Sequence, residues 1–188
     1  MGTLTLPNFV TPPSNPIAIG SYDEWLKLES DVGLELPPDF KEIVSTFGAG
    51  KFAGFISIFN PFYRWKHPQA PTYLNWISTR LDGLSEGHRF HPDFSAPFDV
   101  YPTSGGLLPL GFTDNGDTIC WQVLGRPEDW PIICLDDKTS EIYDEFQMNL
   151  GAFLSRWLSE EISAPRSPLQ ECFRSNHLYS FLTVRNRQ

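Results

Sequence analysis

Apolar residues recur at helical spacing in four stretches of this chain. Short apolar runs, separated by turn residues, precede the last of these four stretches. The clearest helical stripe consists of Phe40, Ile43, Val44 and Phe47. This i, i+3, i+4, i+7 pattern follows Leu36-Pro37-Pro38 and is followed by Gly48, which supplies a start and a stop signal. The pattern predicts a helix over residues 38–47.

A short helix is predicted before it. Ser21 and Glu24 are spaced as a capping box, in which a hydroxyl and a carboxylate satisfy free backbone N–H groups at a helix start. We expect Tyr22, Trp25 and Leu26 to form the apolar face of this helix. The helix is expected to end before Gly33.

Two further stripes predict helices in the second half of the chain. One begins near Pro71-Thr72, ends at Gly83 or Gly87 and contains Tyr73, Trp76, Ile77, Leu81 and Leu84. The other ends near Glu161 and contains Phe146, Leu150, Phe153, Leu154, Trp157 and Leu158. Residues 88–106 are rich in Pro, Gly and Ser and are expected to form a loop.

Strands are predicted between these helices. The run FAGFISIFNP after Gly50 is typical of one strand, and four more are expected at 107–110, 118–124, 131–135 and 141–143. The turn segments DNGD, GRPED and DDKTS between the last four are too short for parallel crossovers and predict an antiparallel meander. The expected fold is a single α+β domain, with a mostly antiparallel mixed sheet flanked by about four helices.

The two ends of the chain differ from its centre. Residues 1–20 contain four prolines and little periodicity, which predicts an extended N-terminal arm. The domain is expected over residues 21–162. Residues 163–188 form a predicted tail in which HLYSFLTV could dock on the domain as an edge strand.

The composition of the chain indicates where in the cell the protein is expected. The chain has 188 residues and 40% hydrophobic residues, enough for one substantial core. Its start lacks the basic and apolar regions of a signal peptide, and no apolar run has the length of a membrane span. Three widely spaced cysteines fit reduced thiols better than a disulfide framework. These features predict a soluble, cytoplasmic protein.

Charge is concentrated in one block. The net charge is −9, and residues 112–161 carry 11 acidic and 3 basic side chains. Such a block repels nucleic-acid phosphates and attracts a basic partner. The alternative is an acidic face that only keeps the protein soluble.

The sequence gives little support for a catalytic or metal-binding site. His88 and His91 lack the spacing of a zinc motif, and His67 and His177 have no nearby ligand cluster, so loop or surface positions are expected. The DNGD turn lacks the later ligands of a calcium loop. No phosphate-binding loop or nucleophile elbow occurs. We expect no metal, no cofactor and no catalytic residue.

Two cysteines are candidate nucleophiles. Cys120 and Cys134 lie in predicted strands within the acidic block, a setting that disfavours a thiolate and favours a packing role. If the connection between their strands is symmetric about Pro127, the two lie across from each other. An uncharted hydrolase, in which one of these thiols is essential, stays a third alternative.

The ordered segments resemble a known family. ELPPDFKEIVSTFGAGKFAGF, GGLLPLGFTDNGDTICWQV, WPIICLD and the closing NLGAFLSRWL are similar to the SUKH superfamily, a domain also found in a fungal cell-wall synthesis regulator. The resemblance covers roughly residues 21–162 and implies an α+β sheet with flanking helices. It also implies a function, because many bacterial members are immunity proteins that bind and neutralise a toxin domain, often a nuclease or deaminase. The family's motif positions are structural, so the resemblance transfers no contact residue.

The acidic block and the resemblance together predict a binding protein rather than an enzyme. We expect an immunity protein whose acidic loops meet a basic toxin domain, with neither nucleic acid nor membrane as partner and with homodimerisation left open. The expected partner-binding residues are Asp114, Asp117, Glu128, Asp129, Asp136 and Asp137. The alternative is a regulatory or scaffold domain of the cell-wall regulator type.

Overall fold

The computed structural model describes residues 6, 10–64, 72–90, 98–136, 141–162 and 179–181. In these ranges the helices are α1 (Tyr22–Val32), α2 (Pro38–Phe47), α3 (Tyr73–Phe90), the 3-10 turn η1 (Pro127–Asp129) and α4 (Leu150–Leu158). The strands are β1 (Gly50–Phe52), β2 (Ile56–Ile58), β3 (Leu107–Thr113), β4 (Thr118–Gln122), β5 (Ile132–Leu135), β6 (Ile142–Phe146) and β7 (Tyr179–Phe181).

The strands form one sheet in the order β6-β5-β4-β3-β2-β1-β7. Every ladder between these neighbouring strands is antiparallel, and the run from β3 to β6 is the expected meander. The predicted α+β class, with four helices around a mostly antiparallel sheet, is confirmed. The division into arm, domain and tail stays a prediction, although β7 pairs with β1 at the edge of the sheet.

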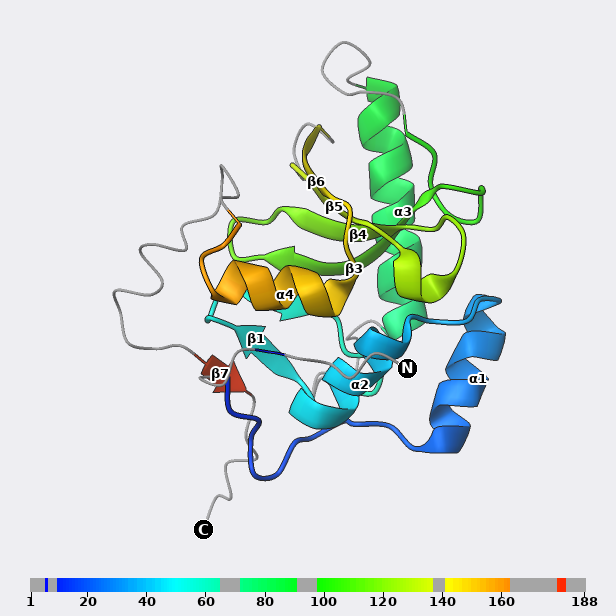
Figure 1. The fold of residues 1–188 in the computed structure, drawn as a ribbon. Coiled ribbons are helices and arrows are strands. Elements are labelled where there is room, and N and C mark those ends of the chain that lie inside the picture. Colours follow the sequence, from blue (N-terminus) through cyan, green and yellow to red (C-terminus); the bar gives the residue numbers. More distant parts are fainter. Residues whose placement is uncertain are drawn as a thin grey trace.

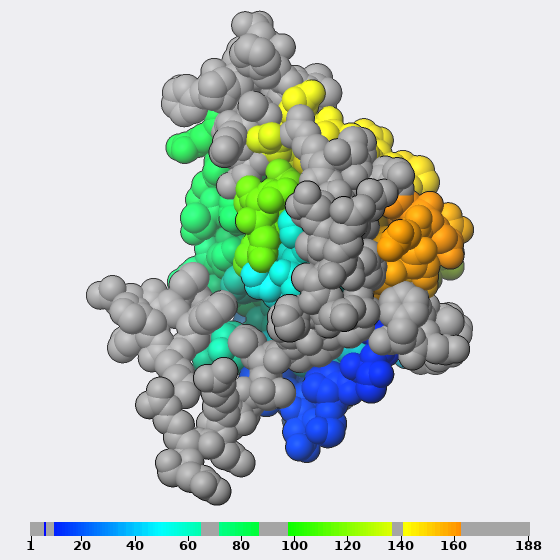
Figure 2. All heavy atoms as spheres, turned by 90° about the vertical axis from the view of Figure 1, so that its left-hand side faces the viewer, coloured from blue at the N-terminus to red at the C-terminus, as the bar shows by residue number. Residues whose placement is uncertain are grey.

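Helices cover both faces of the sheet. Along β4, Ile119 and Trp121 belong to the main core with α2 and α4, whereas Cys120 between them belongs to a second cluster with Leu84 of α3. This alternation follows from the period of two in a strand. Figure 1 shows α4 in front of the sheet and α3 behind it, and Figure 2 shows α3 (green) and α4 (orange) on opposite sides of the strands.

Helix α1 begins as predicted but buries a different face. Ser21 Oγ accepts from the Glu24 N–H at 3.3 Å, and the Ser21 N–H donates to Glu24 Oε2 at 2.8 Å, which completes the capping box. The expected apolar face is wrong for Tyr22 and Leu26, which are 77% and 48% exposed. Trp25 of the expected face does pack inward, on Phe40 and Phe62, and the buried residue of α1 is Leu28.

Helix α2 agrees with its pattern, and a partly buried carboxylate joins it to α4. Phe40, Ile43, Val44 and Phe47 are all buried. Asp39 Oδ1 accepts from the Phe40 N–H at 2.9 Å, and Asp39 Oδ2 accepts from the Gly151 N–H at 2.8 Å. Burial raises the pKa of the Asp39 carboxyl, and the backbone donors oppose that rise. The carboxylate thus satisfies N–H groups at two helix starts.

Three predicted elements differ in the structure. The run FAGFISIFNP forms the two strands β1 and β2, because Ala53 and Gly54 adopt positive φ values of 47° and 65° and reverse the chain. Helix α3 continues through Gly83 to Phe90, and so includes His88, since a glycine weakens a helix without ending it. Phe146 ends β6 instead of opening the last helix, and α4 ends at Leu158 rather than near Glu161.

The glycine of the motif LPLG is required because two strands approach each other closely there. Gly111 in β3 pairs with Ile58 of β2, and a Cβ atom at Gly111 would lie 2.4 Å from the Ser57 carbonyl oxygen. A side chain there would push β2 away from β3. Tertiary contact therefore explains a glycine that the sequence marks only as part of a turn.

Candidate partner-binding surface

The meander places the predicted acidic residues at two opposite ends of the sheet. Asp114 and Asp117 lie in the turn from β3 to β4, and Asp136 follows β5 at the same end. Glu128 and Asp129 lie in η1, between β4 and β5, at the other end. Strand β4 alone separates the ends by about 13 Å, given a rise of about 3.3 Å per residue. The structure does not bring these residues together as one surface.

Asp117 is buried, so the expectation that it stays on the surface is wrong. It is 7% exposed, and its Oδ2 accepts from the Thr113 hydroxyl at 3.2 Å. The Asp117 N–H donates to Thr113 Oγ1 at 3.2 Å, and the Thr113 N–H donates to the Asp117 carbonyl at 2.9 Å. These bonds close the β3–β4 turn, and Asp117 acts as a structural residue.

The other acids at this end are only partly available. Asp114 forms an ion pair with Lys51 of β1, and both side chains are partly exposed. Asp136 is half-buried and its N–H donates to the Glu141 carbonyl at 3.0 Å. Asp137 lies outside the described residues. This end of the sheet therefore offers less negative charge than the sequence predicted.

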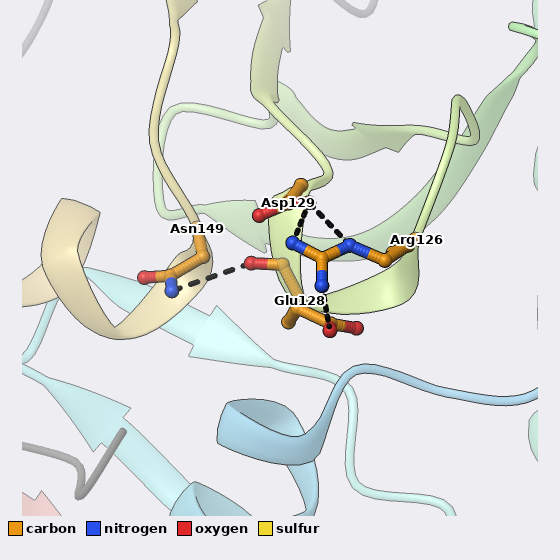
Figure 3. Close-up of polar contacts among 4 residues, drawn as sticks. All are labelled: Arg126, Glu128, Asp129 and Asn149. Atoms are coloured by element: carbon orange, nitrogen blue, oxygen red, sulfur yellow. Dashed lines mark hydrogen bonds and ion pairs between the residues drawn. The ribbon is translucent and has the colours of Figure 1, made fainter. Parts of the chain in front are cut away.

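At the opposite end, η1 presents two carboxylates around one guanidinium (Figure 3). Arg126 Nε and Nη2 donate to Asp129 Oδ2 at 3.0 and 2.8 Å, and Arg126 Nη1 lies 3.2 Å from Glu128 Oε1. The side chains of Glu128 and Asp129 remain 45% and 57% exposed. The hydrogen bond to Asp129 and both carboxylates raise the pKa of Arg126. The cluster keeps one net negative charge facing solvent.

The η1 turn is held by the core beneath it. Trp130, directly after η1, is 2% exposed and its ring centroid lies 6.1 Å from that of Trp121. Asn149 caps α4 by accepting from the Ala152 N–H at 3.0 Å, and its Nδ2 donates to the Glu128 carbonyl at 3.5 Å (Figure 3). The two carboxylates are thus positioned before a partner arrives, which lowers the entropy cost of binding.

Sequence reasoning missed the bases that accompany these acids. Arg126 precedes Glu128 and Asp129 by two and three residues, so its proximity was readable from the GRPED segment. Lys51 and Asp114 are 63 positions apart, and only the pairing of β1, β2 and β3 brings them together. Asn149 reaches Glu128 only because α4 starts beside η1.

Cys120 and Cys134 occupy opposite faces of the sheet. Cys134 pairs with Ile119, and Cys120 pairs with Ile133, so the symmetric register about Pro127 is wrong by one residue. Burial, together with the charges of Asp144 and Asp117, raises the pKa of the Cys134 thiol to about 12. A nucleophile needs the opposite shift.

No group of three or more His, Cys, Asp or Glu able to hold a metal occurs in the described ranges, and His67, His91 and His177 lie outside them.

The Cys134 thiol predicts a loss of stability in alkali. Its pKa rises from an ordinary value of 9.0 to about 12 on folding, so the folded state keeps a proton that the unfolded chain loses. Its contribution is intact below pH 9 and declines as the pH rises toward 12, by roughly 2 to 3 kcal/mol at pH 11. Urea unfolding from pH 7 to 11 should show a smaller decline for Cys134→Ser than for the parent protein. An equal decline of the free energy of unfolding in the two proteins would contradict the proposed role of the Cys134 thiol.

The chain matches a family of known proteins over most of its length. A model of the family SUKH_6, described as SMI1-KNR4 cell-wall, matches residues 22–154. No curated protein and no solved structure matches the chain. None of the helices in the described ranges combines the length and apolar character needed to cross a membrane. The matched range begins with α1 and ends within α4, and so includes the meander and η1.

Proposed function

The chain belongs to the SUKH_6 (SMI1-KNR4 cell-wall) family, and from this premise we propose that it is an immunity protein that binds and neutralises a basic toxin domain. Family membership supports an immunity or regulatory role in general. The observation that carries the more specific proposal is the exposed, preorganised pair Glu128 and Asp129 in η1. The proposed mode of action is non-catalytic: the protein occludes the toxin's working surface.

The chemistry of the partner follows from charge. A nuclease or another nucleic-acid-acting toxin needs a cationic cleft to hold phosphates, and acidic side chains of an inhibitor can occupy that cleft. The net charge of −9 would steer such a partner toward the protein and speed association at low salt. We propose Glu128 and Asp129 as the principal contacts, with Asp114, Asp136 and Asp137 contributing to steering and not to the contact itself.

A second candidate is a regulatory or scaffold domain that binds proteins of the cell's own envelope or signalling machinery. The cell-wall description of the matched family favours it. The two candidates differ in the partner that the protein retains. A single small toxin domain, released progressively by salt, supports immunity, and envelope or signalling proteins support the regulator.

Charge reversal at η1 tests the proposed surface. We expect Glu128→Lys/Asp129→Lys to lower the association rate with the captured toxin domain about 10- to 100-fold at low salt, and less at high salt. The reason is that two attractive carboxylates become three clustered cations with Arg126. Biolayer interferometry at low salt, on the order of 25 mM, and at high salt, on the order of 300 mM, would measure the rates.

A control variant separates this surface from net charge. Glu160→Lys/Glu161→Lys makes the same change of charge at two exposed positions just after α4. We expect its association rate to fall less than that of the η1 variant at low salt and to stay within about threefold of the parent protein at high salt, where charges outside the contact are screened within less than about 10 Å. Equal slowing by both variants would assign the effect to net charge alone and remove η1 as the contact.

A further inference from the structure

A groove lies between α1, α3 and the segment before β3, apart from η1. It has a volume of about 320 Å³. We name it the α1–α3 groove. One wall is a stripe of α3 that includes Leu74 and Leu81, seven residues apart on one helix face, and the other wall includes Val32 and Tyr101. Asp31 and Asp82 supply its carboxylates.

The walls of the groove are fixed by the fold. The Tyr101 hydroxyl donates to the Val32 carbonyl at 3.0 Å, which ties the end of α1 to the segment before β3. The Gly105 N–H donates to the Val123 carbonyl at 2.8 Å, just after β4. Because η1 also follows β4, the segment that forms this wall and η1 lie at the same end of the sheet.

The groove combines an apolar interior with unbalanced negative charge. Leu74 is 37% exposed, which leaves apolar surface open to a ligand. No basic side chain of the described residues lines the groove, and Asp82 has no ion-pair partner among them. Asp31 pairs with Lys27 at 2.7 Å, but the Lys27 side chain is 75% exposed. Such an exposed i, i+4 pair is weak, so an incoming cation can replace Lys27 easily.

We propose that the α1–α3 groove receives an arginine side chain of the protein partner. The methylene groups of the arginine would pack on Val32, Leu74 and Leu81, and the guanidinium would lie between Asp31 and Asp82. Arginine suits such a site because its guanidinium is weakly hydrated and binds carboxylates in two directions, while its stem covers apolar surface. The inference rests on the proposed function for the basic character of the partner.

A pair of synthetic peptides tests the groove directly. The full chain, labelled with ¹⁵N, is titrated with acetyl-Ala-Leu-Arg-Leu-Ala-amide and with the same peptide carrying citrulline, which keeps the shape and removes the charge. We expect the amide signals of Val32, Ser78, Asp82 and Tyr101 to shift saturably, with a Kd for the arginine peptide in the millimolar range. The citrulline peptide should bind at least fivefold more weakly. No shifts at these residues, or equal affinity for both peptides, would overturn the proposal.

Variants assign the interaction to the two carboxylates. Asp82→Asn should weaken the arginine peptide at least fivefold, and Lys27→Ala should strengthen it about twofold by releasing Asp31. Asp23→Asn is the matched control, since Asp23 is an exposed acid of α1 outside the groove. An equal loss in Asp23→Asn and Asp82→Asn would mean that general charge, not the groove, attracts the peptide.

The experiments distinguish failure of the groove proposal from failure of the proposed immunity function. If Glu128→Lys/Asp129→Lys slows toxin association but the arginine peptide does not shift the groove residues, only the groove proposal fails. If the peptide binds in the groove and no toxin domain is retained by the protein, the immunity proposal fails and the arginine site stands.

Discussion

Phe40→Ala is expected to lower the free energy of unfolding by about 3 to 5 kcal/mol. Phe40 is 0% exposed, and its ring packs edge-on against Trp25 of α1 at 5.8 Å and Trp121 of β4 at 5.1 Å. Removing the ring leaves a cavity where three elements meet. Because domains are stable by only about 5 to 15 kcal/mol, the loss approaches the total for a marginal one.

Urea unfolding followed by tryptophan fluorescence would measure this loss. Ser45→Ala on the exposed side of the same helix is the control, and it should change stability by less than about 0.5 kcal/mol. A loss below about 1 kcal/mol in Phe40→Ala would show that α1 and α2 do not pack on β4 as described.

Gly48→Ala is expected to cost about 2 to 5 kcal/mol, from two causes that add. Gly48 has a φ of 67°, which a side chain strains, and an added Cβ would lie 2.4 Å from the Ile17 carbonyl oxygen. That carbonyl already accepts from the Ala49 N–H at 3.1 Å. The segment containing Ile17 must move away, and its contacts with the end of α2 are lost.

Gly83→Ala provides a control of opposite sign. Gly83 lies within α3, and a Cβ added there would meet no atom within 4 Å beyond the adjoining backbone of its own helix. Alanine should raise the free energy of unfolding by about 0.5 to 1 kcal/mol, because it loses less backbone entropy in a helix. Thermal melts of both variants would test the pair. A Gly48→Ala protein as stable as the parent would contradict the close contact between Ile17 and the end of α2.

Helix α2 and the meander could be predicted because each carries its own local signals. Phe40 to Phe47 repeat at helical spacing between Pro38 and Gly48, and Asn115-Gly116 marks a tight reversal between two apolar runs. Such signals depend on neighbours within a few residues, so no tertiary information is needed to interpret them. The fold class followed from the order of these elements.

The errors came from patterns that local signals leave ambiguous. In α1, Tyr22, Trp25 and Leu26 are all apolar, and only packing against Phe40 and Phe62 selects Trp25 as the inward residue. In FAGFISIFNP an unbroken apolar run hid a reversal at Ala53 and Gly54, whose positive φ values arise from the hairpin itself. Both cases needed contacts that the spacing of apolar residues does not specify.

The candidate surface was predicted in composition but not in geometry. The sequence indicates that 112–161 is acidic and that DNGD and GRPED are turns. The alternation of antiparallel turns then separates these two segments, and the fold buries Asp117, pairs Asp114 with Lys51 and leaves Glu128 and Asp129 exposed. The α1–α3 groove had no sequence signal, because its walls come from separate elements that only folding brings together.

By itself the sequence determined the helices with strong periodicity, the meander, the excess of negative charge and the family resemblance, since each depends on residue type and short-range spacing. The tertiary structure alone decided which side of α1 is buried, why Gly48 and Gly111 must be glycine, and which acids face solvent. The physical reason is that burial, close backbone approach and charge pairing are properties of segments brought together by folding. In this protein those segments, such as β1 and β3, lie far apart along the chain.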